Sequence, residues 1–200
     1  MFAFGILGGI IPLFVIGAII YVVLRRRNDK EGITMYQALM AYFYTMISAS
    51  IITTAVGVGC LLMAAFSSAY NDRPIASDVT LGVTLLVTGG VICLLHVFGK
   101  RTLEAKEGKS TPLLKKVYLF FMLTVFSIGG LVALPVAIYE VANYYVEHVE
   151  EYMYHSDPSG SIAAAVVIVP MWVYYFMRVM RNTHAAKKDE SSEEGVSTVI

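Results

Sequence analysis

Charge is scarce in this sequence, because Asp, Glu, Lys and Arg together make up only 15% of the 200 residues. Soluble domains carry about 25% charged residues, so this composition excludes a water-soluble globule. Cysteine is scarce as well, with only Cys60 and Cys93 in the chain. The sequence also lacks Cys or His spacing for zinc, a glycine-rich phosphate loop and a nucleophile elbow. It therefore predicts neither an enzyme nor a bound cofactor.

Long apolar runs take the place of charge. Hydrophobic residue types make up 57% of the chain, and the mean hydropathy is +0.67. A helix needs roughly 20 apolar residues to cross a bilayer, and continuous rather than alternating runs exclude the strands of a β-barrel. The sequence thus predicts an all-α integral membrane protein with five transmembrane helices. The five runs are 2–24, 35–66, 79–98, 117–139 and 161–180.

Helix-start signals and charge runs divide the chain. Thr34 followed by Gln37 predicts a capping box, and Thr111 followed by Pro112 predicts a cap and first helical residue. The tail after Arg181 is rich in Lys, Glu and Ser and is predicted to be disordered. Four segments follow: an N-terminal transmembrane anchor with a basic cytoplasmic loop (1–34), a first two-helix unit (35–110), a second two-helix unit with an acidic outer loop (111–181) and the tail (182–200).

The basic residues are strongly segregated. Fourteen of the fifteen Lys and Arg residues fall in three segments that five spans would place on one side of the membrane, and the exception is Arg73. The positive-inside rule then predicts an outside N-terminus and a cytoplasmic C-terminus. Because a triple arginine follows the first run and no basic region precedes it, this run is predicted to be a retained anchor rather than a cleaved signal peptide. A bacterial cytoplasmic membrane is the expected location.

The chain contains an internal similarity. Residues 42–46 align with 118–122, and residues 90–101 align with 170–181, which gives a period of roughly 76 to 80 residues. Each unit begins and ends on the same side of the membrane, so the two repeats are predicted to be parallel. The alternative is the general similarity of any two apolar helices.

The residues that carry this similarity also resemble a known family. They are an aromatic helix beginning near Tyr118, the run Pro170-Met171-Trp172 leading to Arg178 and Arg181, and a weaker first copy with Gly90, His96 and Arg101. Over about residues 36–182 the chain resembles an uncharacterised bacterial multi-pass membrane family that is defined only as a domain of unknown function. The resemblance implies a helix bundle and no catalytic activity.

Polar residues inside the spans are candidates for function. Ser50, Thr53 and Thr54 form a hydroxyl stripe on the second span, which could either pack closely or line a narrow polar path. His96 is the exceptional ionisable residue within a span, and a bond to a neighbouring helix or to headgroups is favoured over a haem ligand for it. Packing is the favoured interpretation of the stripe.

Small residues recur at helical spacing and predict close helix packing. Such residues let two backbones approach within a bundle or between subunits. The predicted packing residues are Gly5, Gly9, Gly57, Gly129 and Ala133.

The acidic outer loop offers the only metal-ligand pattern. Glu147, Glu151 and His155 recur every four residues, which would place them on one face of a helix. They are weak candidates for a divalent-metal site, and a solvated face of a helix that extends the fourth span is the favoured interpretation.

These patterns predict a non-enzymatic scaffold or accessory subunit of a membrane complex. The alternative is a small-solute or ion pathway through the bundle, and a third, weaker interpretation is a sensor that uses the acidic loop. The expected partners are the lipid bilayer and other membrane subunits or a second copy of the chain, with no nucleic acid.

Overall fold

The computed structural model describes residues 34–70, 75–107, 111–147 and 157–197 of the chain. The chain divides into two compact units, Met1–Leu39 and Met40–Ile200. The described part of the first unit is residues 34–39, which hold the cap and first turn of a helix. The second unit holds everything else that follows here.

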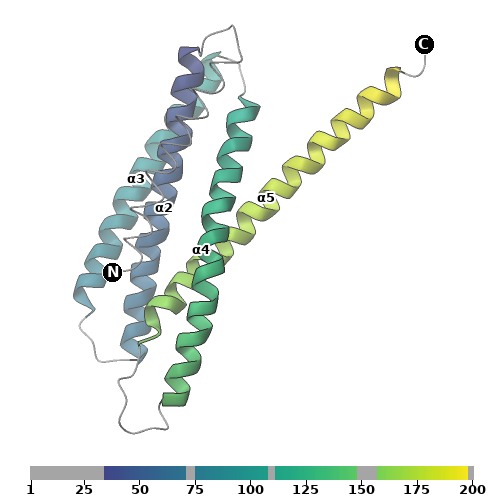
Figure 1. Cartoon of the computed structure of the whole chain (residues 1–200). Helices are drawn as coiled ribbons and strands as arrows, with labels where there is room; N and C mark the ends of the chain where they lie inside the picture. The colour runs from purple at the N-terminus through teal and green to yellow at the C-terminus, as the bar shows by residue number, and fades with distance from the viewer. Residues whose placement is uncertain (1–33, 71–74, 108–110, 148–156, 198–200) are drawn as a thin grey trace. The chain divides into compact units, whose positions relative to one another are not determined.

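The described residues form four helices and no strand (Figure 1). They are α2 (Met35–Tyr70), α3 (Ala76–Glu107), α4 (Pro112–Glu147) and α5 (Ser159–Ser197). All four are long and apolar enough to cross a membrane, over Met35–Ser68, Ala76–Lys106, Pro112–Val146 and Ser159–Thr183. The all-helical, multi-pass part of the prediction is confirmed for these four. The predicted first span, 2–24, lies outside the described residues.

The helix starts follow the sequence signals in part. The backbone N–H of Gln37 donates to the Thr34 hydroxyl at 3.3 Å, which confirms the hydroxyl half of the predicted capping box. Helix α4 begins at Pro112 as predicted, and the Thr111 carbonyl accepts the first helical bond from Lys115. The Thr111 hydroxyl, however, has no hydrogen-bond partner among the described residues. Thr111 therefore occupies the cap position without capping through its side chain.

Helix α5 begins at a cap that the sequence analysis did not identify. Asp157 Oδ1 accepts the N–H of Ser159 at 3.0 Å, and Pro158 stands between them. An acidic cap followed by proline is a favourable helix start, because proline lacks the N–H that would be unpaired there.

The C-terminal tail differs from the prediction. Helix α5 continues to Ser197, whereas the polar composition of 182–200 predicted disorder. The physical reason lies in helix propensity and propagation: Ala185, Ala186 and the following Lys and Glu residues are good helix formers, and extending an existing helix avoids the nucleation penalty.

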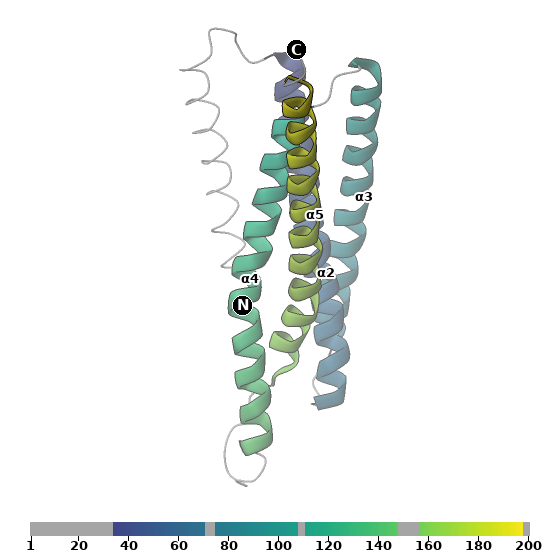
Figure 2. The ribbon, with the colours of Figure 1, turned by 90° about the vertical axis from the view of Figure 1, so that its right-hand side faces the viewer.

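Within the second unit, α2 lies between α3 and α4 in both views of the ribbon (Figures 1 and 2). A buried cluster joins α4 to α5, and Ile51 and Ala55 of α2 pack against it. The cluster consists of Leu119, Met122, Phe126, Tyr175 and Val179. Among the described residues, this cluster is the main core of buried side chains, and it lies between α4 and α5.

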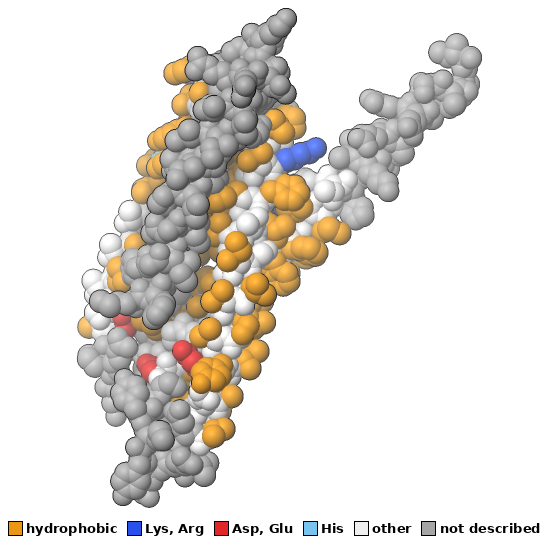
Figure 3. Space-filling model, viewed as in Figure 1, with side chains coloured by type: hydrophobic (Ala, Val, Ile, Leu, Met, Phe, Trp, Pro, Cys, Tyr) orange, Lys and Arg blue, Asp and Glu red, His pale blue; other side chains and the backbone are white. Residues whose placement is uncertain are grey.

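Up-and-down packing gathers most of the described basic residues at one end of this unit. Lys100 of α3 contacts Tyr44 of α2, and Tyr44 contacts Tyr118 of α4, so the basic ends of α3 and α4 both lie beside the start of α2. We call this the basic end. At the other end Ser67 of α2 bonds to Asp157 before α5. On the face drawn in Figure 3, Asp and Glu side chains lie near one end and a Lys or Arg side chain lies toward the other.

Candidate functional site

The hydroxyl stripe of α2 donates its protons within its own helix. Ser50 bonds to the Met46 carbonyl, Thr53 Oγ1 donates to the Ala49 carbonyl at 2.9 Å, and Thr54 Oγ1 donates to the Ser50 carbonyl at 2.8 Å. Thr45 and Ser48 do the same one or two turns earlier. Each hydroxyl is therefore satisfied inside the helix, as an apolar environment requires.

Helix α3 covers part of this stripe at Gly89. A Cβ atom added to Gly89 would lie 2.6 Å from Thr54 Oγ1, 3.0 Å from the Thr54 nitrogen and 3.1 Å from the Ser50 carbonyl oxygen. Real Cβ atoms do not approach other atoms so closely. The backbone of α3 thus lies directly against Ser50 and Thr54, and glycine is needed for this approach.

A second close approach lies one to two turns away, at Gly57 and Gly82. A Cβ on Gly57 would lie 2.7 Å from the Leu86 nitrogen and 2.9 Å from the Gly82 oxygen, and one on Gly82 would lie 3.0 Å from the Gly57 oxygen. We call Gly57, Gly82 and Gly89 the glycine seam. Gly57 is one of the packing residues predicted from the sequence, whereas Gly82 and Gly89 are not. Their spacing of seven residues, two helical turns, is the signal that could have found them.

The predicted small residues of α4 lie against α5 at ordinary distances. A Cβ on Gly129 would be 3.4 Å from the nearest atom of Ile168, and Ala133 is buried with 8% of its surface exposed. The backbones of α4 and α5 are therefore farther apart here than those of α2 and α3 at the seam. Gly5 and Gly9 lie outside the described residues.

His96 of α3 bonds to the neighbouring helix, as the favoured interpretation expected. Its Nδ1 lies 2.7 Å from the Ile92 carbonyl oxygen, and its Nε2 lies 3.2 Å from the Tyr42 hydroxyl. A carbonyl only accepts, so Nδ1 carries a proton, and in the neutral ring Nε2 then accepts from Tyr42. Both ring nitrogens are engaged in these bonds.

A row of tyrosines crosses the basic end from α2 to α5. The Tyr44 and Tyr118 rings are 5.3 Å apart, and the Tyr118 hydroxyl lies 3.2 Å from the Tyr175 hydroxyl. The buried Tyr175 ring stacks on Phe126 at 5.6 Å and meets the exposed Tyr174 ring at 5.1 Å. Tyrosines are common at membrane interfaces, because the ring is apolar and the hydroxyl is polar.

A basic side chain lies at each end of this tyrosine row, Lys100 beside Tyr44 and Arg178 beside Tyr174. Lys100 Nζ lies 4.5 Å from the centre of the Tyr44 ring and also forms an ion pair with Glu104 at 3.7 Å. Arg178 donates from Nη1 to the Tyr174 hydroxyl at 2.7 Å, and its guanidinium carbon lies 5.8 Å from the centre of that ring. Among the described residues Arg178 has no carboxylate partner. The two cations thus differ in how their charge is balanced.

The opposite end of the unit has a buried polar contact. The Ser67 and Ser159 hydroxyl oxygens are 2.7 Å apart, and Ser67 also donates to Asp157 Oδ2 at 3.4 Å. Ser67 is fully buried, with 0% exposed. This contact joins the end of α2 to the start of α5, and sequence reasoning did not find it because the residues are about 90 positions apart.

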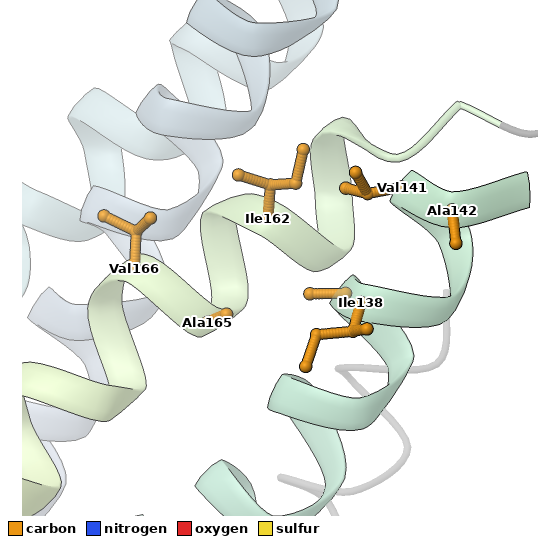
Figure 4. A pocket seen from close by; sticks show the side chains of 7 residues that line it. Ile138, Val141, Ala142, Ile162, Ala165 and Val166 are labelled. Atoms are coloured by element: carbon orange, nitrogen blue, oxygen red, sulfur yellow. The ribbon is translucent and has the colours of Figure 1, made fainter. Parts of the chain in front are cut away.

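A shallow apolar groove of about 420 Å³ lies between α4 and α5 (Figure 4). Ile138 and Ala142 line it from α4, and Ile162 and Ala165 line it from α5. The side chains that line the groove are neither charged nor able to form hydrogen bonds, so they cannot bind a polar ligand or act as an acid or base.

The candidate metal site in the acidic loop falls largely outside the described residues. Glu151 and His155 lie there, and Glu147 is the last residue of α4. Helix α4 does extend eight residues past the predicted end of its span, which agrees with the expected helical extension. Within the part of the chain that the structure covers, no group of His, Cys, Asp or Glu residues is arranged to hold a metal ion.

No family model, curated protein or solved structure matches this chain. The resemblance to a bacterial multi-pass family stays a prediction.

Proposed function

We propose that this multi-pass membrane protein is a non-enzymatic scaffold or accessory subunit of a membrane complex. One observation carries the proposal: the polar groups of α2 serve packing. The Thr54 hydroxyl donates to its own helix and lies under the backbone of Gly89, and Ser50 is 3% exposed. In lipid, helices associate through close packing and internal hydrogen bonds, which is how these residues are used.

The alternative, a solute or ion pathway, has less support. A pathway needs oxygen atoms that face a water-filled space and replace the hydration shell of the permeant. The Thr54 hydroxyl oxygen instead faces α3 at Gly89, and Ser50, whose backbone carbonyl oxygen also faces Gly89, is buried. Thr53, which is partly exposed, is the one member of the stripe that α3 does not cover in this way.

The triple replacement Ser50→Ala, Thr53→Ala and Thr54→Ala tests the choice between these functions. The scaffold proposal expects the flux of ions and small solutes through reconstituted vesicles to stay at the wild-type level, while thermal stability or partner retention changes. Thr80→Ala with Thr84→Ala is the control, because these exposed α3 hydroxyls also bond to their own helix. A specific wild-type flux that disappears only in the α2 variant would overturn the proposal.

The scaffold proposal expects that the protein binds a partner chain in the membrane. Purification in mild detergent, followed by mass analysis of the intact assembly, should find a second membrane chain or a second copy in a fixed ratio. A monomer under all such conditions, in a membrane extract that retains other known complexes, would contradict it.

The proposal includes five spans with the N-terminus outside and the C-terminus in the cytoplasm. Its support is the basic end, where Lys100, Lys115 and Arg178 come from three helices of the second unit. A cysteine at exposed Ser77 should react with an impermeant thiol reagent in intact cells, whereas a cysteine at Ser110 should react only after lysis. The reverse pattern would overturn the orientation.

We also propose that the helical hairpins α2–α3 and α4–α5 are parallel copies of one ancestral unit. In each hairpin a tyrosine of the first helix bonds across to the second helix: Tyr42 to His96, and Tyr118 to Tyr175. Tyr42 and Tyr118 are equivalent in the sequence alignment, while the equivalent of His96 is Phe176, the neighbour of Tyr175. The bonded residue of the second helix is therefore shifted by one position between the two hairpins, from the position of His96 to that of Tyr175.

A further inference from the structure

The basic end carries an excess of positive charge that the described side chains leave largely unbalanced. Lys100 is paired with Glu104, whereas the other basic side chains there have no ion pair among the described residues. These are Arg101, Lys106, Lys115, Lys116, Arg178 and Arg181. A surface of this kind at the edge of the apolar spans attracts anionic headgroups.

Arg178 differs from the other cations in how it is held. It belongs to the apolar span Ser159–Thr183, and its guanidinium is fixed on the hydroxyl of Tyr174, one turn back toward the centre of the span. Guanidinium is always charged and has five N–H donors, of which the Tyr174 bond uses one. Arg178 lies close to the end of this span, where an anionic headgroup can balance its charge.

The surroundings of Arg178 fit one end of a phospholipid. The Tyr174 ring packs against the ring of buried Tyr175, with 5.1 Å between the ring centres, and this contact supports the tyrosine that binds Arg178. Arg181 stands three residues after Arg178, which places it on a neighbouring position of the same helix surface. Exposed apolar side chains, Val173 and Met177, lie beside the pair and would contact acyl chains rather than water.

We propose that Tyr174, Arg178 and Arg181 form a binding site for the phosphate of an anionic phospholipid in the leaflet at the basic end. Arg178 binds the phosphate oxygens through its free N–H groups, Tyr174 positions the guanidinium, and Arg181 adds a second charge. The lipid is favoured over free phosphate because the site lies within a span and beside exposed apolar side chains.

The test measures the lipid that the purified full chain retains. The protein is reconstituted in phosphatidylcholine with phosphatidylglycerol, extracted gently and analysed by native mass spectrometry. The wild-type chain should keep phosphatidylglycerol in preference to phosphatidylcholine. Arg178→Gln should lower this retention about tenfold, the value of one good charge-assisted contact.

Arg101→Gln is the matched control, because it removes the same charge from an exposed arginine at the same end without touching a tyrosine pair. It should retain phosphatidylglycerol like the wild type. Equal losses in the two variants would mean diffuse attraction and would overturn the site.

Two further measurements test the site without relying on the folding of Arg178→Gln. Tyr174→Phe keeps the charge but releases the guanidinium, and it should weaken retention while the melting temperature without anionic lipid stays unchanged. Unchanged retention would overturn the role of the pair. Displacement of the lipid by millimolar inorganic phosphate, or retention of an acidic protein in place of lipid, would also overturn the proposal.

Discussion

In the hairpin of α2 and α3 the two backbones touch at glycines, whereas in the hairpin of α4 and α5 large side chains fill the space between the helices. At the seam a single methyl group on Gly57 would collide with the α3 backbone. At Gly129 the same methyl group would make an ordinary contact with Ile168. The second hairpin instead buries Met122, Phe126 and Tyr175.

The difference shows two ways of holding helices together where lipid removes the hydrophobic driving force between them. Glycine contacts gain stability from close backbone packing and fix the distance between helices, so they tolerate no added atoms. Side-chain contacts gain stability from the volume that they fill, so they tolerate no lost atoms. Adding a methyl group at a glycine should therefore destabilise the α2–α3 hairpin, whereas removing a large side chain should destabilise the α4–α5 hairpin.

The largest effect is expected in the second hairpin. Phe126→Ala should lower the free energy of unfolding in mixed micelles by about 3 kcal/mol, because it leaves a cavity beside Tyr175. The control is Ile128→Ala on the same helix, where the side chain is 54% exposed and its loss should change little. Equal effects of the two substitutions would contradict stabilisation of this hairpin by its buried side chains.

The next effect is expected at the seam. Gly57→Ala and Gly89→Ala should each destabilise the protein by about 2 kcal/mol, because the helices must separate to admit the methyl group. Gly59→Ala and Gly90→Ala are matched controls, since nothing lies within 4 Å of a Cβ at either position. These should be neutral or slightly stabilising, because alanine favours a helix over glycine. The free energy of unfolding in mixed micelles is measured for all four variants. Seam variants as stable as their controls would refute the close approach of the two backbones.

The contact between the end of α2 and the start of α5, opposite the basic end, is expected to matter less. Ser67→Ala should cost about 1 kcal/mol, the typical value of a buried hydrogen bond, because it leaves Ser159 without this partner. The adjacent exposed residue offers a control: Ser68→Ala removes only a bond within the helix. A loss for Ser68→Ala as large as that for Ser67→Ala would show that the contact contributes nothing specific.

The smallest effect is expected at Gly129, the glycine of α4 that lies against α5. Gly129→Ala should change the free energy of unfolding by less than about 0.5 kcal/mol, because the added methyl finds ordinary contact distances and alanine favours the helix. Destabilisation similar to that of Gly57→Ala would mean that the two hairpins pack alike.

Sequence reasoning located the four described helices because membrane spans are long and apolar, but the apolar runs are shorter than the helices that contain them. The run 79–98 lies in a helix that extends from Ala76 to Glu107, since Lys, Arg and Glu beyond the apolar core still form helix well. The pair Tyr174 and Arg178 is visible in the sequence at a spacing of four residues, yet its support by Tyr175 and Tyr118 is not.

The glycine seam shows the same limit of the sequence. Gly57 was a predicted packing residue, but which glycines of α3 it meets depends on the rotation and depth of that helix. Gly90 is next to Gly89 and faces open space. Periodicity cannot choose between two adjacent glycines without the partner helix.

Accessibility of position 54 to a small water-soluble thiol reagent tests the central claim, that the hydroxyl stripe packs under α3. In a chain with Cys60→Ala and Cys93→Ala, we predict that Thr54→Cys stays unmodified in reconstituted vesicles, while Ser77→Cys, at an exposed position near the start of α3, is modified. Modification of Thr54→Cys at a rate similar to that of Ser77→Cys would mean that water reaches the stripe, and it would contradict the account.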